Sequence, residues 1–162
     1  MTTPARATIR PATPGDWPGI ELLLRARALP LEGAGEHLER FLVAERGATV
    51  VGCVGLERYG PLGLLRSLAV DEGIAGRGVG TELVRALLAR APRLGVDALY
   101  LLTTTAADYF PRFGFEPLPR SALPDALSAS AELRGACPAS AVAMRLRLPA
   151  QATGGSRGGS SA

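Results

Sequence analysis

Apolar and polar positions in the first part of the chain switch from strand-like to helical spacing. Residues 8–12 form a short β-prone run and are expected to be a first strand. Thr13 then precedes Pro14, as at the start of a helix, and apolar residues recur at helical spacing until the chain reaches Pro30. The pattern therefore predicts a strand and a helix, followed by a second short helix over residues 35–40.

The middle of the chain contains its longest apolar runs. Residues 41–45 and 48–59 are two apolar segments joined at Arg46 and Gly47, which predicts a β-hairpin. The apolar run over residues 62–70 has the length of one buried strand. After a glycine-rich turn, helical spacing returns from residue 79 to about residue 94 and is expected to be shortened by a late proline, Pro92.

Shorter elements are expected toward the end of the chain. In order, we predict a strand, a helix, a strand, a helix and a last strand, at residues 98–103, 106–113, 115–118, 121–133 and 141–148. Residues 151–162 consist mostly of Gly, Ser and Ala without periodicity, and such a segment cannot bury enough apolar surface to fold. We therefore expect a domain over residues 1–148 and a disordered tail over residues 149–162.

Length and composition restrict the class of protein. The 162 residues suit one domain. The net charge is +3, and all 18 basic residues are arginines that do not cluster with aromatic residues, which argues against nucleic-acid binding. No apolar run has the length of a membrane span, and the N-terminus lacks a signal pattern. Cys53 and Cys137 lie far apart and suggest neither a disulfide framework nor a metal site. A cytoplasmic protein without a metal is expected, and the lack of lysine and asparagine indicates a GC-rich bacterial genome.

The glycine-rich turn before the long helix is a candidate anion site. The first N–H groups of a helix have no partner within the helix, and the helix dipole adds partial positive charge there. Gly76, Gly78 and Gly80 lack a Cβ, so a phosphate can approach the backbone, and Arg77 can add a charge-assisted hydrogen bond. An ordinary strand-to-helix turn is the alternative.

Two common phosphate-binding motifs do not fit this turn. A P-loop requires a lysine after its last glycine, and the chain contains no lysine. A dinucleotide fingerprint requires a further glycine where this chain has Thr81.

The turn resembles the acyl-CoA site of the GCN5-related N-acetyltransferases. That family's motif is Arg or Gln, two residues, Gly, one residue, and Gly or Ala. Gly78-Val79-Gly80 matches the glycine part, and Leu68-Ala69-Val70 is similar to the family's central strand. Phe110, four residues before Gly114-Phe115, matches a second signature. One departure is Ala75, which stands where the family has Arg or Gln.

This resemblance covers residues 8–148 and implies the fold. The fold is of the α/β (α+β) class, with a mixed, mostly antiparallel sheet that is splayed between its fourth and fifth strands and has helices on both faces. Within the family, the chain is most similar to the small bacterial acetyltransferases associated with arsenic-resistance gene clusters. The segments that carry this narrower likeness are residues 41–45, 65–70, 101–106 and 137–141. A homodimer is expected because dimers are common among such proteins.

The resemblance also implies a reaction, the transfer of acetyl from acetyl-CoA to the primary amine of a small molecule such as an amino-acid-like toxin. Acetyl transfer requires a polarised thioester carbonyl, reactants held close together and a deprotonated amine. Two alternatives stay open. A non-catalytic acyl-CoA sensor is favoured by Ala75 and by Phe110, which stands where many relatives carry a tyrosine that acts as general acid. The other alternative is an acetyltransferase that acts on proteins or peptides.

The residues expected to bind the cofactor follow from the match to the family. Backbone groups of Leu68 and Val70 should pair with the pantetheine arm, and an N–H group near Leu68 should act in catalysis by facing the acetyl oxygen. The expected cofactor-binding residues are Leu68, Ala69, Val70, Gly76, Arg77, Gly78, Val79, Gly80, Thr81, Thr104, Tyr109 and Phe110.

The acceptor side is expected to contain the general base. Glu57, at the end of the third strand, is the candidate, and the alternative is a strand-end carboxylate that is solvated or paired with Arg58 or Arg66. The expected acceptor-binding residues are Glu36, His37, Arg58, Arg66, Thr103 and Thr105. Arginines, Arg112 included, can hold an anionic acceptor, whereas threonines at this position can also cap the following helix.

Overall fold

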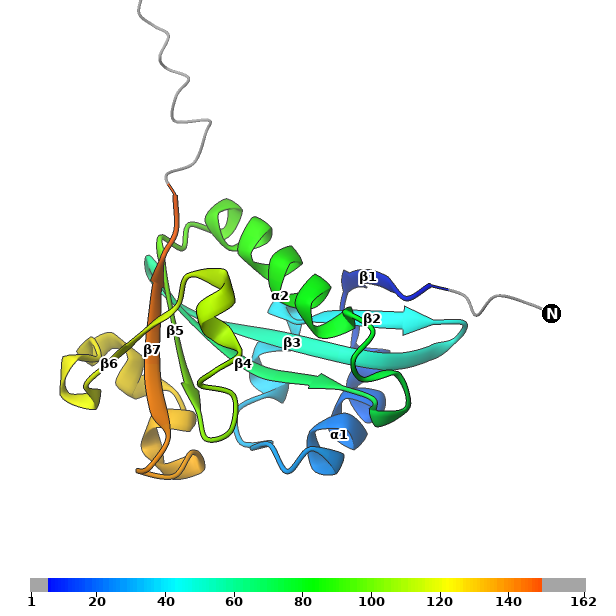
Figure 1. Ribbon diagram of the computed structural model, residues 1–162, viewed down its shortest axis with the longest axis horizontal. Helices are drawn as coiled ribbons and strands as arrows, with labels where there is room; N and C mark the ends of the chain where they lie inside the picture. Colours follow the sequence, from blue (N-terminus) through cyan, green and yellow to red (C-terminus); the bar gives the residue numbers. More distant parts are fainter. Residues whose placement is uncertain (1–5, 150–162) are drawn as a thin grey trace, which may run out of the picture.

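A seven-stranded sheet forms the centre of the computed structural model, which describes residues 6–149 (Figure 1). Its strand order is β1-β2-β3-β4-β5-β7-β6. The strands are β1 (Thr8–Pro11), β2 (Leu42–Arg46), β3 (Thr49–Tyr59), β4 (Leu62–Val70), β5 (Ala98–Thr103), β6 (Glu116–Leu118) and β7 (Val142–Arg147). The β4–β5 pair is parallel and the other pairs are antiparallel. The strands expected from the sequence are confirmed to within about a residue at each end.

Helices cover both faces of the sheet. The helical elements are α1 (Trp17–Ala26), α2 (Val79–Arg90) and the short turns η1 (Pro14–Asp16), η2 (Gly35–Arg40), η3 (Glu72–Ile74), η4 (Ala91–Leu94), η5 (Phe110–Phe113), η6 (Arg120–Ala122), η7 (Asp125–Ala129) and η8 (Glu132–Ala136). Helix α1 packs on a cluster that contains Val43 and Cys53, whereas α2 packs on one that contains Leu42 and Val54. Neighbouring residues of a strand face opposite sides of a sheet, so the two helices lie on opposite faces.

Prolines interrupt three of the expected helices, and two of these helices are shorter than predicted. The expected helix over residues 121–133 is instead the separate turns η6, η7 and η8, since Pro124 and its neighbour Leu123 are both extended. The expected helix over residues 106–113 reduces to η5, which has Pro111 near its start. Helix α2 ends at Arg90 and continues as η4, as Pro92 predicted.

The central strands separate partway along their length. Strands β4 and β5 are paired only from Leu62 and Ala98 to Leu64 and Tyr100, although β4 continues to Val70. The expected splay between the fourth and fifth strands is therefore confirmed, and it leaves the second half of β4 with a free edge toward β5.

A β-bulge interrupts β4 in this free half. Cys53 pairs with Ala69 and Gly55 pairs with Arg66, so two residues of β4 lie opposite the single residue between Cys53 and Gly55. One of those two residues, Ser67, has φ +61°, which is rare for a residue with a side chain. The bulge therefore changes the direction of the backbone next to the splay.

Some sequence expectations concern features that the described residues test only in part. The predicted tail lies outside the described residues except for Pro149. Between residues 6 and 149, no helix is long and apolar enough to cross a membrane. Over the same range, the structure brings together no group of three or more His, Cys, Asp and Glu side chains that could hold a metal ion.

Candidate functional site

The splay between β4 and β5 opens a first cavity of about 410 Å³. Its walls come from residues 65–68 of β4, from residues 101–106 in and after β5, and from the segment around η8. Phe110 closes one side. Of the residues predicted from the sequence, Leu68, Arg66, Thr103, Thr104, Thr105 and Phe110 meet at this cavity.

A second cavity, of about 400 Å³, lies at the glycine-rich turn that begins α2. It shares Leu68 with the first cavity. Gly76 and Gly78 have φ of +85° and +86°, and a Cβ on either residue would meet no atom within 4 Å. Most of the predicted cofactor residues line it: Leu68, Ala69, Val70, Gly76, Gly78, Val79, Gly80, Thr81 and Tyr109. The turn therefore presents backbone to open space, as an anion site requires.

Two arginines supply positive charge to the second cavity, and Arg77 is not one of them. Arg27 and Arg112 line the cavity, whereas Arg77 is exposed and lies outside its lining. The Arg112 guanidinium stacks 4.2 Å from the centroid of the Tyr109 ring and donates from Nε to the Tyr109 carbonyl at 2.9 Å. The Tyr109 hydroxyl lies 2.9 Å from Thr81 Oγ1. Arg27 follows the last residue of α1 and carries no motif, which is why sequence reasoning missed it.

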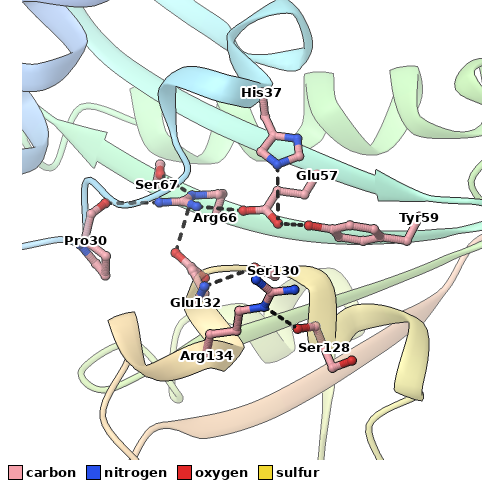
Figure 2. Close-up of polar contacts among 10 residues, drawn as sticks. All are labelled: Pro30, His37, Glu57, Tyr59, Arg66, Ser67, Ser128, Ser130, Glu132 and Arg134. Carbon is pink, nitrogen blue, oxygen red and sulfur yellow. Dashed lines mark hydrogen bonds and ion pairs between the residues drawn. The ribbon is translucent and has the colours of Figure 1, made fainter.

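A buried ion-pair cluster lies beside the first cavity (Figure 2). Arg66 Nη1 lies 2.6 Å from Glu57 Oε2, and Arg66 Nε lies 3.4 Å from Glu132 Oε2. The same guanidinium donates to Ser67 Oγ at 3.0 Å and to the Pro30 carbonyl at 3.1 Å. Arg66, which was expected to hold an anionic acceptor, lines the first cavity and makes these contacts with protein groups, while a role toward an acceptor stays a prediction.

Glu57 lies behind this arginine and does not line the first cavity. Its side chain is completely buried and accepts hydrogen bonds from Arg66 and from the Tyr59 hydroxyl. Burial alone would raise the pKa of Glu57, but the hydrogen bonds from Tyr59 and Arg66 outweigh it and hold the pKa below its ordinary value. The structure thus shows the pairing with Arg66, while a role as base stays a prediction.

Glu132 is the acidic residue that does line the first cavity. It belongs to η8, where the Ser130 hydroxyl accepts from its backbone N–H at 3.1 Å and its carbonyl accepts from the Cys137 N–H at 3.2 Å. Burial raises the pKa of Glu132 to about 7. Sequence reasoning placed this residue inside a regular helix and gave it no role, because a π-turn leaves no periodic signal.

Glu36 and His37 border a third cavity, of about 620 Å³, rather than the first. His37 Nε2 lies 3.7 Å from Glu57 Oε1, so this residue approaches the ion-pair cluster from the other side. Figure 2 shows His37 and Arg66 on different sides of the Glu57 carboxylate.

Arg58 and Thr103 have local structural roles. Arg58 follows Glu57 in β3 and therefore faces the opposite side of the sheet. It donates to the Gly60 carbonyl at 3.0 Å and lines none of the three cavities, so its expected role at the acceptor site stays a prediction without support from these cavities. Thr103 Oγ1 accepts from the Ala106 N–H at 2.9 Å, so Thr103, rather than its two neighbours, caps the turn after β5.

Comparison with known proteins identifies the family. Residues 7–115, more than half of the chain, match the Acetyltransferase (GNAT) family. The chain therefore belongs to the GNAT family, and the mixed, splayed sheet predicted from the sequence is that family's fold.

Curated relatives carry the name amino-acid acetyltransferase. The protein from Azotobacter vinelandii is 35% identical over 131 residues, which is 73% of this chain and 29% of that protein. The protein from Neisseria meningitidis serogroup B is 28% identical over 134 residues, or 75% of this chain and 30% of that protein. The chain thus spans about a third of the length of these relatives.

Solved structures share the fold. N-acetylglutamate synthase from Neisseria gonorrhoeae, complexed with coenzyme A and N-acetyl-glutamate, superposes with a TM-score of 0.76 at 24% identity, over 91% of this chain and 36% of that chain. Rv2747 from Mycobacterium tuberculosis, in complex with CoA and NLQ, has a TM-score of 0.73 at 26% identity and is similar in length, with 88% of this chain and 99% of that chain covered. The narrower likeness to arsenic-resistance acetyltransferases stays a prediction.

Proposed function

We propose that the protein is an acetyl-CoA-dependent N-acetyltransferase that acts on the primary amine of a small, amino-acid-like molecule. The observation that carries this proposal is the pair of cavities that join at Leu68. One cavity offers a glycine-rich helix start to a phosphate, and the other opens at the free edge of a splayed strand. A long ligand with an anionic end and a reactive end suits this arrangement.

The second cavity suits the diphosphate of coenzyme A. The first backbone N–H groups of α2 have no partner within the helix, and Gly76, Gly78 and Gly80 at this helix start line the cavity. Arg27 and Arg112 add the charge that Ala75, which also lines this cavity, does not provide. Arg27 and Arg112 can therefore take the place of the Arg or Gln that the family motif has where this chain has Ala75.

The first cavity suits the pantetheine arm and the acetyl group. Because β5 leaves β4 after Leu64, backbone groups near Leu68 are available to a ligand rather than to a neighbouring strand. An N–H group there can stabilise negative charge on the acetyl oxygen. Phe110 is buried and packs edge-on to Phe115, with 5.7 Å between the ring centroids. It lines the cavity as an apolar wall, and the departing thiolate of coenzyme A is protonated by water.

The acceptor class is supported by the relatives. Curated relatives are named amino-acid acetyltransferases, and Rv2747 was crystallised with CoA. The likeness to arsenic-resistance acetyltransferases adds arsenic-containing amino-acid analogues to the acceptors worth testing. A homodimer, also expected from that likeness, is checked by the mass of the protein in solution.

Two measurements test the proposed function. Calorimetric titration with acetyl-CoA should give saturable heat. A titration without heat would show that acetyl-CoA is not the cosubstrate. Thiol release is then followed across a panel of glutamate, glutamine, their arsenic and phosphorus analogues, and short peptides. We expect release with at least one amino acid or analogue. Tight binding of acetyl-CoA without release from any amine would indicate the sensor, and acetylation of peptides alone would indicate an acetyltransferase that acts on proteins or peptides.

A further inference from the structure

We propose that Glu132, rather than Glu57, is the general base that takes the proton from the acceptor amine. The inference rests on the proposed function, since it names a residue for that same reaction.

Position in the first cavity is the first argument. A base must lie within hydrogen-bond reach of the proton that it removes. Glu132 is the only carboxylate among the described residues that line the cavity, and it shares that lining with Leu68, where the acetyl group is expected. Glu57 is absent from the lining, and Arg66 lies between the two carboxylates, in contact with both (Figure 2).

Proton-accepting capacity is the second argument. Hydrogen bonds from Arg66 and Tyr59 stabilise the charged form of Glu57, which makes it a weak base. Glu132 makes one longer contact, 3.4 Å, to the same arginine. Burial raises the pKa of Glu132 to about 7, which suits a base that works near neutrality.

The titratable groups around Glu132 do not compete with it as the base in the first cavity. The charged and titratable groups that act on it are Arg66 from β4, Glu57 from β3 and the Cys137 thiol beyond η8. Burial raises the pKa of Cys137 to about 12, so the thiol keeps its proton and does not act as a base. His37 borders the third cavity instead.

The chemical step then balances without any further reactant. The acceptor enters as an ammonium ion, and one N–H proton passes to the Glu132 carboxylate. The amine lone pair forms the new N–C bond with the acetyl carbonyl carbon, and the C–S bond to coenzyme A breaks with its electron pair on sulfur. The remaining excess proton on nitrogen goes to water. The proton on Glu132 returns to solvent after the products leave. Arg66 is a positioning residue in this scheme, because it contacts both carboxylates and takes no proton itself.

The test compares isosteric variants. Glu132→Gln, Glu57→Gln and, as matched control, Glu39→Gln are assayed for thiol release with the amino acid that the wild type acetylates. Glu39 lies on the surface in an ion pair with Arg40 and lines none of the three cavities. Each variant is also titrated with acetyl-CoA, so that a loss of cofactor binding is separated from a loss of chemistry.

We expect Glu132→Gln to lower kcat by about 100-fold or more, the usual contribution of a general base, with acetyl-CoA affinity within about threefold of wild type. The wild-type kcat/KM should fall below about pH 7, as Glu132 becomes protonated, and this acid limb should be missing in Glu132→Gln. Glu57→Gln should keep the acid limb, and Glu39→Gln should match the wild type.

Three results would overturn the proposal. They are near-wild-type turnover of Glu132→Gln, an acid limb that survives in this variant, and an acid limb that disappears in Glu57→Gln instead. Should Glu132→Gln not fold, Glu132→Asp decides, because it retains a carboxylate: a lowered kcat with the limb present supports the proposal, and a missing limb contradicts it. Absence of wild-type turnover despite acetyl-CoA binding is the separate failure of the proposed function.

Discussion

Replacing Arg66 by methionine removes the guanidinium that pairs with the buried carboxylate of Glu57. The side chains of Arg66 and Glu57 have no solvent exposure, so water does not screen this ion pair. Methionine fills a similar length of side chain, which keeps the loss of packing small. The variant therefore measures the cost of an uncompensated charge in this cluster.

The expected cost is large. Breaking a buried pair by removing one partner destabilises a protein by about 3–5 kcal/mol, and the whole free energy of unfolding of a domain is about 5–15 kcal/mol. Arg66 lies 2.6 Å from Glu57 and 3.4 Å from a second carboxylate, Glu132. These short, buried contacts are of the kind for which loss of one partner has this large cost. We predict that Arg66→Met loses about 3–5 kcal/mol at pH 8.

The loss should shrink as the pH falls. In the wild type, the lowered pKa of Glu57 means that its contribution to stability is present above its unfolded value and is lost as the pH falls through the folded value. In Arg66→Met, burial without a cation raises the folded pKa of Glu57, so protonation relieves the penalty as the pH falls through that raised value. Wild type and variant should therefore differ less at pH 5 than at pH 8.

Urea denaturation followed by the fluorescence of the single tryptophan, Trp17, measures both effects. The double variant Glu57→Gln with Arg66→Met is the control, because it removes the stranded charge, and it should be more stable than Arg66→Met alone at pH 8. A loss below about 1 kcal/mol that does not change between pH 5 and pH 8 would refute the reasoning, since only an exposed pair behaves in that way.

Two further predictions concern packing and cofactor binding. Gly55→Ala should lower the free energy of unfolding in urea by about 1–3 kcal/mol, because a Cβ there would clash with ring atoms of the buried Phe41. Unchanged stability would show that the ring can move to make room for the methyl group. Arg112→Ala should weaken the binding of acetyl-CoA in calorimetry by about three- to tenfold, as expected for the loss of one partly exposed charge-assisted contact. The exposed control Arg93→Ala should bind acetyl-CoA as the wild type does. Equal affinities of Arg112→Ala and the wild type would show that Arg112 does not belong to the cofactor site.

The elements with strong local patterns were predictable from the sequence. The apolar run of β4 and the helical spacing of α2 set the strand, the turn and the helix, and the glycines between them indicated the turn that lines the second cavity. Pro92 also predicted the early end of α2. These features depend on neighbouring residues, so a local pattern is enough to find them.

The cluster beside the first cavity depends on tertiary contacts and was found only in part. Arg66 is the single charged residue in the run of β4, and a charge in a buried strand indicates a partner. The partner Glu57 was considered, but Glu132 lies more than 60 residues further along and belongs to an irregular turn. No spacing rule connects these residues, because the splay and the bulge bring them together.

The extra residue in β4 also decides which layer of the molecule receives a positive charge. Arg66 and Ala69 are three positions apart, an odd number, which in a regular strand would put their side chains on opposite sides. The bulge at Ser67 shifts the alternation of side chains along β4 by one residue. The side chains of Arg66 and Ala69 therefore both face the side of the sheet where α1 and Glu57 lie. In a strand of the same length without the bulge, the guanidinium would instead face the hydrocarbon layer beneath α2, away from both of its acids.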